Sequence, residues 1–471
     1  MPVARVARGA RHAGSCTLAI VLAACGGGGQ DDGPAVGRET CGDAIGCGNV
    51  YLMVDETAFD TSAGLTRELG VMTKDQPTPL IAGQRFYGSA LPDAQGVRLY
   101  TYGGDVWTAA DGLAFTRTGV INGIPFGDGE QSMAVSRTDD LPDSQRYLAA
   151  FSTPSVEAGI AISSDGLSFT ALNGGAPVTG RASDTYDQLL FDPVRGQYRL
   201  NTRTDFGDAG GSGEIRGVRT MVNSDIVGTP TAWTTISEWS LTPWFEPTDR
   251  QIYAKTEFVY RGVYFGLATV YSGIGDMSEG PVDYVTRHER NVLDAYLLTS
   301  RNGIDWDLHW ILAGQPLVAR GASGTFDKDA ILPAAQVVTT GGKHVLYYSG
   351  ADERHDVPAR NWGIGRATVQ QDRLVCQAAR GGPGTAQTAF LPISQSSFGI
   401  DVSAAHGSVT LQFEKRSVDG NTQSGTPISI SSRDSVMRVP FDQIFTSRVL
   451  QTDVVRVHLQ LDNAAVCALA L

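Results

Sequence analysis

Short runs of alternating apolar and polar residues dominate the chain, and turns rich in glycine, aspartate and asparagine separate them. Alternation with a period of two predicts β-strands with one buried face. Five such runs end in aromatic or small residues, at 97–102, 146–151, 198–202, 263–268 and 344–348. Long helical runs of Ala, Leu, Glu and Lys are missing, so the pattern predicts an all-β protein.

A turn with a shared spacing recurs between these strands. The dipeptide DG stands at 111–112 and 165–166, and NG stands at 302–303, each a few residues before Phe or Trp. Asp or Asn followed by Gly supplies the positive φ of a tight hairpin turn. Asp192 precedes Pro193 and is interpreted as part of a hairpin turn of a different kind. We interpret these acidic turn residues as structural, not catalytic.

Strands grouped in fours, with a repeat of roughly 50–80 residues, indicate the blades of a β-propeller. We expect a five-bladed β-propeller over residues 49–375. The apolar strand at 50–55 precedes the first blade and is expected to pair with the last one, closing the ring. Insertions at 205–217 and 272–291 are expected to shape a binding face.

A second, smaller domain is expected after the propeller. Residues 377–387 are rich in Gly, Ala and Pro and are interpreted as a linker. The alternating strands that follow predict a small, jelly-roll-like β-sandwich over residues 376–471.

The first residues have the pattern of a targeting segment. Arginines precede an apolar run at 16–24 that is too short to span a bilayer. The sequence LAAC at 22–25 resembles a bacterial lipobox. This resemblance implies a signal peptide over 1–24, lipidation of Cys25, a flexible tether over 25–48, and an exported protein anchored to the membrane of the bacterial envelope. An ordinary secretion signal is the alternative.

The remaining cysteines are expected to form disulfides, Cys41 with Cys47 and Cys376 with Cys467, because the chain is exported. No Cys-x-x-Cys motif occurs, and no histidine stands at ligand spacing, so no metal site is expected. No cofactor is expected, because no Walker or Rossmann loop stands between a strand and a helix. The formal net charge of −13 argues against nucleic acid as a partner.

Several short motifs resemble those of a known family. They are LMVD at 52–55, DQLLFDPVRGQY at 187–198, DRQIY at 249–253 and GTFD at 324–327. With parts of the C-terminal region, they resemble the invertase-like and arabinanase-like propeller glycosidases, and more closely a group of bacterial glycosyl hydrolase-like proteins. The resemblance implies a glycoside hydrolase-like protein that acts on an oligo- or polysaccharide. The chain departs from the family in its first blade, whose inner strand at 84–91 carries no carboxylate.

Candidate site residues follow from the propeller fold, because residues at the starts of the inner strands converge at one end of the axis. Glycoside hydrolysis needs two carboxylates, one as acid and one as base or nucleophile. The catalytic candidates are Asp187, Asp249 and Asp327. The substrate-binding candidates are Asp184, Arg250, Tyr253, Glu257, Arg85 and Tyr87. A cap or hairpin role is an equally good interpretation of the three catalytic candidates, and Glu257 is equally compatible with a contact to a neighbouring blade.

Two alternatives stay open. The first is a carbohydrate-binding or surface scaffold protein that keeps the fold without catalysis. The second is sialidase-like chemistry, with Tyr253 as nucleophile and Arg85, Arg203 and Arg250 binding a carboxylate.

Overall fold

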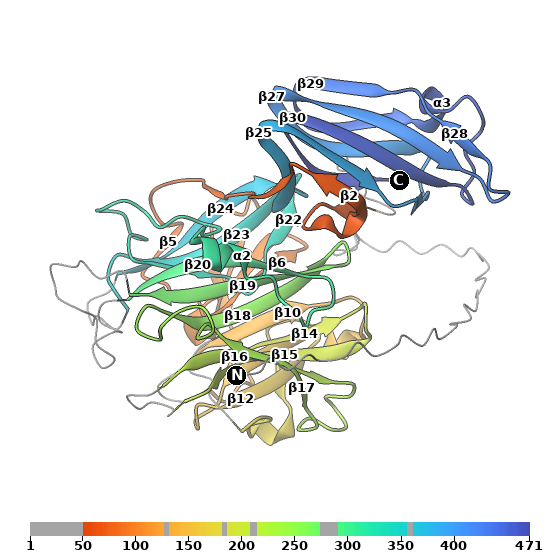
Figure 1. The fold of residues 1–471 in the computed structure, drawn as a ribbon. Coiled ribbons are helices and arrows are strands. Elements are labelled where there is room, and N and C mark those ends of the chain that lie inside the picture. Colours follow the sequence, from red (N-terminus) through yellow and green to blue (C-terminus); the bar gives the residue numbers. More distant parts are fainter. Residues whose placement is uncertain (1–49, 127–130, 181–185, 208–213, 274–290, 356–360) are drawn as a thin grey trace, which may run out of the picture. The chain divides into compact units, whose positions relative to one another are not determined.

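The computed structural model describes residues 50–126, 131–180, 186–207, 214–273, 291–355 and 361–471. Within these ranges nearly every regular element is a β-strand, and the strands group into five propeller blades followed by a C-terminal sheet. The blades run from orange to cyan in Figure 1, and the C-terminal sheet is blue. The all-β propeller fold expected from the sequence is therefore confirmed.

In the described ranges, blades 1 to 3 are antiparallel sheets of four strands each. Blade 1 contains β6 (Ser89–Asp93), β7 (Gly96–Tyr100), β8 (Asp105–Ala109) and β9 (Thr116–Val120). Blade 2 contains β10 (Met133–Arg137), β11 (Tyr147–Ser152), β12 (Ala158–Ser163) and β13 (Thr170–Ala171). Blade 3 contains β14 (Gln188–Asp192), β15 (Gln197–Asp205), β16 (Arg216–Asn223) and β17 (Thr234–Ser240). Apolar side chains of neighbouring blades share cores, as Val106 does with Met133 and Phe151.

Blades 4 and 5 are joined through a single parallel pairing of Leu293 with Ala330. Blade 4 contains β18 (Arg250–Tyr260), β19 (Val263–Ser272) and β20 (Val292–Ser300), and helix α2 (His309–Ala313) follows it. Blade 5 contains β21 (Ala330–Pro333), β22 (Val338–Thr340), β23 (Lys343–Ala351) and β24 (Trp362–Gln370).

The ring is closed by two short strands that precede blade 1. They are β4 (Thr73–Lys74) and β5 (Ile81–Ala82), and both pair antiparallel with β24 of the last blade. The expected closure by residues 50–55 is wrong. Strand β1 (Val50–Leu52) pairs instead with the C-terminal strand of the chain.

The recurrent DG and NG turns have the structural role expected of them. Gly112, Gly166 and Gly303 all have positive φ, between 67° and 73°. The oxygen Oδ1 of Asp111 accepts the backbone N–H groups of Leu113 and Ala114, each at 2.8 Å. A Cβ atom at Gly112 would lie 2.6 Å from the hydroxyl of Tyr347 in blade 5. Glycine is therefore required there both for its backbone conformation and for close contact between blades.

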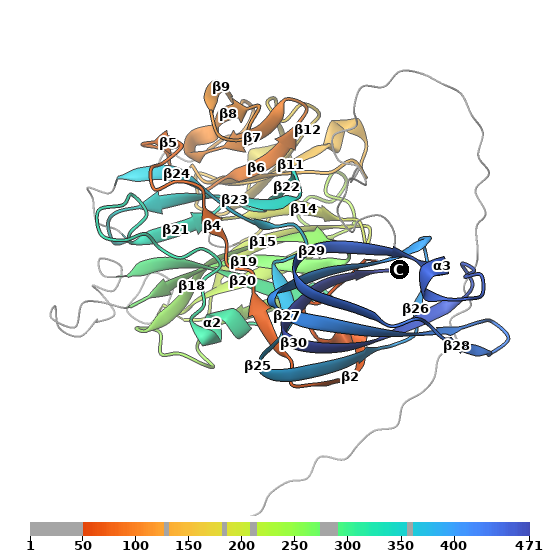
Figure 2. The same cartoon turned by 90° about the horizontal axis from the view of Figure 1, so that it is seen from above.

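In the described ranges, the C-terminal strands pair as one continuous sheet, into which β1 to β3 also enter. The long strands β25, β27 and β30 run side by side in Figures 1 and 2. The members are β1, β2 (Phe59–Ala63), β3 (Thr66–Leu69), β25 (Val375–Thr388), β26 (Leu391–Pro392), β27 (Ser397–Arg416), β28 (Thr422–Ser424), β29 (Ile428–Pro440) and β30 (Val454–Ala470), with helix α3 (Phe441–Ile444). The described strands thus form one hydrogen-bonded sheet, and the small β-sandwich stays a prediction.

The expected linker at 377–387 is wrong, because these residues lie inside β25. Strand β25 pairs with β30 on both sides of a bulge between Ala379 and Pro383. The bulge absorbs the residues between them, including Gly381 with φ 77°. Bulges bend a strand without ending it, so a Gly- and Pro-containing passage need not be a linker.

A disulfide joins Cys376 on β25 to Cys467 on β30, across 91 residues of sequence, as expected. Cys25, Cys41 and Cys47 lie outside the described residues. Among the helices that the structure describes, none is long and apolar enough to cross a membrane.

Candidate functional site at the propeller axis

One end of the propeller axis is lined by aromatic and charged residues. Because the strands of a blade are antiparallel, the start of each inner strand and the end of each second strand lie at the same end of the blade. The residues there contact one another across blades 1, 3, 4 and 5. We call the following residues the axial cluster: Arg85, Tyr87, Tyr102, Tyr186, Tyr253, Tyr271, His355 and Trp362.

Tyrosine rings form the buried part of the axial cluster. The hydroxyls of Tyr87 and Tyr253, from blades 1 and 4, hydrogen-bond to each other. The ring of Tyr186 meets that of Tyr87 edge-on, with centroids 5.3 Å apart, and its hydroxyl donates to the carbonyl of Phe86 at 2.9 Å. Burial raises the pKa of Tyr186 well above its usual value, so the phenol stays protonated. The structure thus brings the predicted residues Tyr87 and Tyr253 together.

A β-bulge directs Tyr253 toward the axis. The pairing of β18 with β19 passes from Ile252 opposite Val270 to Ala254 opposite Thr269, which leaves Tyr253 as the extra residue. A bulge of this kind changes the direction of a side chain locally and is common beside active sites. The ring of Tyr253 then packs edge-on against Tyr271, at 4.9 Å between centroids.

Arg85 and two half-exposed rings form the accessible part of the axial cluster. The guanidinium carbon of Arg85 lies 3.8 Å from the ring centroid of Tyr102 and 5.9 Å from that of Trp362. It also lies 5.2 Å from the ring of Tyr87. A cation held between aromatic faces is stabilised by their quadrupoles. This arrangement offers both stacking surfaces and a planar donor to a ligand.

Beside the axial cluster lies a group of ionised residues on β15, β16 and the described residues that flank them. We call Arg203, Asp205, Glu214 and Arg216 the acid–arginine group. Arg203 donates to Asp205 at 2.8 Å and also to Glu214, which Arg216 contacts at 3.4 Å. The guanidinium of Arg216 lies 5.6 Å from the ring of Tyr253 and 5.4 Å from that of Tyr271. The group is therefore in contact with the axial cluster.

Sequence reasoning missed Asp205, Glu214 and Arg216 as site residues. The glycines within residues 205–217 favour an insertion, and its charged residues lie at its two ends. The available signal was the closely spaced pair Glu214 and Arg216 at the start of a strand, opposite Arg203 and Asp205 at the end of the preceding strand.

Asp187 directly follows Tyr186 and precedes the inner strand of blade 3. It is 1% exposed, and its neighbour in the chain, Tyr186, belongs to the axial cluster. Asp184 lies outside the described residues.

Asp327 holds together the last blade and the strand that closes the ring. Its carboxylate accepts from Lys74 on β4 at 2.5 Å, from Tyr348 at 2.8 Å and from Thr325 at 2.9 Å. Burial raises the pKa of Tyr348, and the neighbouring Asp327 raises it further. These contacts show that Asp327 stabilises the closure of the ring. It is not part of the axial cluster.

Asp249 and Arg250 lie at the start of β18 but not in the axial cluster. Asp249 is exposed, and within the described residues its carboxylate makes no hydrogen bond or ion pair. Arg250 donates to the carbonyl of Ile311 at 2.8 Å and stacks on Phe245. The arginine cluster required by the sialidase-like alternative is therefore not assembled from Arg85, Arg203 and Arg250.

Glu257 lies in a buried ionic network between blades 3 and 4. It contacts Arg199 through an ion pair and Lys255 at 2.9 Å, and its side chain is fully buried. Burial opposes its ionisation, but the charges of Lys255 and Arg199 outweigh burial and lower the pKa of Glu257 to about 2. Lys255 also donates to Thr220 at 2.9 Å. The structure thus places Glu257 in contact with the neighbouring blade 3. Of the two roles expected for Glu257, substrate binding or a contact between blades, it shows the contact between blades.

His355 contacts the axial cluster, with its Nε2 3.3 Å from the hydroxyl of Tyr271. Among the described residues, His, Cys, Asp and Glu side chains do not gather in groups of three or more that could hold a metal ion.

Comparisons with known proteins give distant structural similarities. No family model matches the chain, and no curated protein matches it. A solved glycoside hydrolase superposes with a TM-score of 0.40 and 12% sequence identity, over 64% of this chain and 92% of its own. A family 32 β-fructofuranosidase from Bombyx mori gives a TM-score of 0.36 and 10% sequence identity, over 85% of this chain and 93% of its own. A family 32 glycoside hydrolase from Bifidobacterium adolescentis gives a TM-score of 0.36 and 9% sequence identity, over 88% of this chain and 83% of its own.

Proposed function

We propose that the protein is an exported, lipid-anchored glycoside hydrolase that binds a glycan across the end of the propeller axis. One observation carries this proposal: aromatic rings from four blades and the guanidinium of Arg85 meet there, and the acid–arginine group of blade 3 contacts two of the rings. Ligand sites combine apolar and aromatic walls with a few convergent polar groups, and this end of the axis has both.

Sugar binding is assigned to the accessible part of the axial cluster. The rings of Tyr102 and Trp362 offer flat surfaces for the C–H face of a pyranose, and Arg85 between them donates to ring substituents. The phenols of Tyr87 and Tyr253 supply further hydrogen bonds deeper in the site.

Hydrolysis is assigned to Asp187 and Glu214. Ion pairs with Arg203 and Arg216 stabilise the negative charge of Glu214 and suit it to act as base or nucleophile. Asp187, which is buried and directly follows Tyr186 in the chain, is assigned the role of acid and protonates the leaving oxygen. Asp249, exposed at the start of β18, is left to contact outer parts of the substrate, and Asp327 has a structural role.

Export and anchoring rest on the lipobox-like sequence before Cys25. The disulfide between Cys376 and Cys467 supports an oxidising compartment. Replacing Cys25 by Ala is expected to move the protein from the membrane fraction to the soluble fraction. Retention of this variant on the membrane would contradict the anchor.

A second candidate function is carbohydrate binding without hydrolysis. It is favoured by the ion pairs that already occupy Asp205 and Glu214, and by the lack of a carboxylate at 84–91.

A panel of aryl glycosides and polysaccharides separates the two functions. Hydrolysis of at least one substrate is expected from the hydrolase. Sugar binding, measured by calorimetry, with no turnover of any substrate would instead establish the binding protein.

A further inference from the structure

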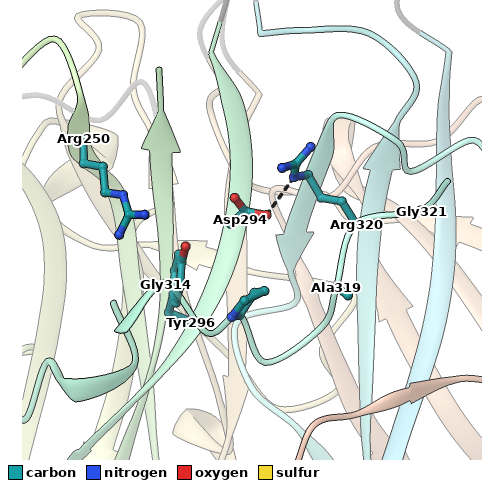
Figure 3. Close-up of a pocket in the computed structure, with 8 residues that line it drawn as sticks. Arg250, Asp294, Tyr296, Gly314, Ala319, Arg320 and Gly321 are labelled. Carbon is teal, nitrogen blue, oxygen red and sulfur yellow. Dashed lines mark hydrogen bonds and ion pairs between the residues drawn. The ribbon is translucent and has the colours of Figure 1, made fainter. Parts of the chain in front are cut away.

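A pocket of about 350 Å³ lies beside the start of β18, apart from the axial cluster. It is bounded by β18, by β20, and by the segment that follows α2 (Figure 3). Its lining includes Arg250, Asp294, Tyr296, Gly314, Arg320 and Gly321. This volume is at the small end of the range for ligand sites and suits a single sugar unit.

The charges in the pocket do not cancel. Arg320 donates to Asp294 at 2.8 Å, and Asp294 is largely buried, so these two charges neutralise each other. Arg250, on the other side of the pocket in Figure 3, has no carboxylate within ion-pair distance in the part of the chain that the structure describes. The pocket therefore carries one net positive charge, in a chain whose formal net charge is −13.

Arg250 is fixed by its neighbours, but most of its N–H donors remain available to a ligand. One of its five N–H donors bonds to the carbonyl of Ile311 at 2.8 Å, at the C-terminal end of α2. Its guanidinium carbon lies 4.8 Å from the ring centroid of Phe245. Stacking and one hydrogen bond fix the plane of the guanidinium and leave further donors for a ligand, which lowers the entropic cost of binding an anion.

Tyr296 lies between Arg250 and the Asp294–Arg320 pair in Figure 3. Burial raises the pKa of Tyr296, and Asp294 raises it further, so its phenol keeps its proton and can donate. A planar cation and a phenol on one side, and a fixed carboxylate on the other, match a ligand that has both a carboxylate and hydroxyl groups.

We propose that this pocket binds a hexuronate unit, whose carboxylate pairs with Arg250 and Tyr296 and whose hydroxyls reach Asp294. The carboxylate gives the ligand one negative charge, which matches the single net positive charge of the pocket. The sugar part of this inference rests on the proposed function, because Arg250 and Tyr253 stand three residues apart on β18 and one glycan chain can reach both places. Binding of the carboxylate stands independently of hydrolysis.

Calorimetric titration of the full chain tests the proposal directly. Glucuronate and galacturonate are the probes, with glucose and galactose as neutral counterparts and acetate and inorganic phosphate as simple anions. We expect a uronate to bind at least about tenfold more tightly than its neutral counterpart, and Arg250→Gln to weaken uronate binding by at least about tenfold. Arg117→Gln, which removes an exposed ion pair in blade 1, is the matched control and should bind like wild type.

The other outcomes are decisive. No binding of either uronate overturns the proposal, and so does unchanged affinity in a folded Arg250→Gln variant. Acetate or phosphate binding as tightly as the uronates overturns the sugar assignment. Uronate binding that is lost in Tyr253→Phe but kept in Arg250→Gln would move the ligand to the axis. Uronate binding without any turnover would contradict the proposed hydrolysis but support the uronate pocket. Turnover of neutral glycans without uronate binding would support the hydrolysis and overturn the uronate pocket.

Discussion

The hydroxyls of Tyr87 and Tyr253 hydrogen-bond to each other and so connect blade 1 with blade 4 across the propeller axis. Tyr253 is directed there by a bulge, and Arg216 lies over its ring. Two phenols facing each other in a buried site can donate to and accept from a substrate oxygen that separates them. This pair is therefore the point where the account of the site is most easily probed.

Replacing Tyr253 by Phe removes the hydroxyl and keeps the ring. We expect kcat/KM for the glycan substrate to fall at least about tenfold, because a hydrogen bond to the reacting sugar is lost. Thermal unfolding should shift by only a few degrees. The control is Tyr347→Phe, which also removes a hydroxyl bond between blades, to the carbonyl of Gly112 at 2.7 Å, but away from the axis. Equal kinetic effects of both variants would count against a role for Tyr253 in the site.

Asp327→Asn should affect stability and not catalysis. The change leaves Lys74 without its charged partner, so we expect a loss of about 1–3 kcal/mol in the free energy of unfolding. The turnover number per folded molecule should equal that of wild type. The double variant Lys74→Gln/Asp327→Asn should recover part of the lost stability. A collapse of kcat in a fully folded Asp327→Asn protein would return this residue to the catalytic candidates.

His344 should make the fold sensitive to mild acid. The backbone N–H of Asp372 donates to its Nε2 at 3.1 Å, so the ring is neutral and its Nδ1–H donates to Thr339 at 2.9 Å. Burial, assisted by the charge of Arg261, lowers the pKa of His344 to about 3. In the unfolded chain the His344 imidazole takes up a proton near pH 6.5. The contribution of His344 to the free energy of unfolding is therefore complete above pH 6.5 and is lost as the pH falls toward 3.

Denaturant titrations between pH 7 and pH 4 measure this effect. His344→Gln should be less stable than wild type at pH 7, but its free energy of unfolding should fall less steeply with acid, by up to about 1.4 kcal/mol per pH unit. His406→Gln, at an exposed position, should follow the wild-type curve. Parallel curves for wild type and His344→Gln would show that this histidine is not the acid-sensitive group.

The disulfide between Cys376 and Cys467 should contribute strongly to the C-terminal sheet. It connects neighbouring strands across 91 residues, and a cross-link of that span restricts the unfolded chain. The Cys376→Ala/Cys467→Ala variant should lose about 2–5 kcal/mol in the free energy of unfolding. Wild type treated with a reductant should approach the variant. A double variant as stable as the oxidised wild type would disprove this contribution.

The blades could be predicted from the sequence because their signals are local. The turns at Gly112, Gly166 and Gly303 each encode a positive φ, and alternation encodes the strands between them. The ring closure could not be predicted, because β4 contains only Thr73 and Lys74, too few residues for a periodic pattern. The composition of residues 377–387 favours a linker because two glycines lie in the bulge of β25 and a proline follows them, and sequence alone does not distinguish a bulge from a break.

The site could be predicted only in part, for a related reason. Topology places residues near the starts of inner strands, such as Tyr87, at the axis, whereas the direction of the Tyr253 side chain also depends on a bulge that the sequence does not reveal. The position of Asp327 against Lys74 depends on which strand closes the ring, and that of Glu257 on which face of β18 meets blade 3. Glu214 lies in the site because of ion pairs with Arg203 and Arg216; the close spacing of Glu214 and Arg216 is visible in the sequence, but the pairing with Arg203 depends on how β15 and β16 align.

The most direct test of the account is the turnover of a glycan substrate by Asp187→Asn and Glu214→Gln. Each variant is expected to lose about 10²- to 10⁴-fold in kcat, because an acid or a base is removed from the reaction. Sugar binding should stay close to that of wild type, and both variants should remain folded, with a lower unfolding temperature in Glu214→Gln because Arg203 and Arg216 lose a charged partner. A variant that is folded, binds the sugar and turns it over at the wild-type rate would contradict the central claim that these two carboxylates carry the chemistry at the propeller axis.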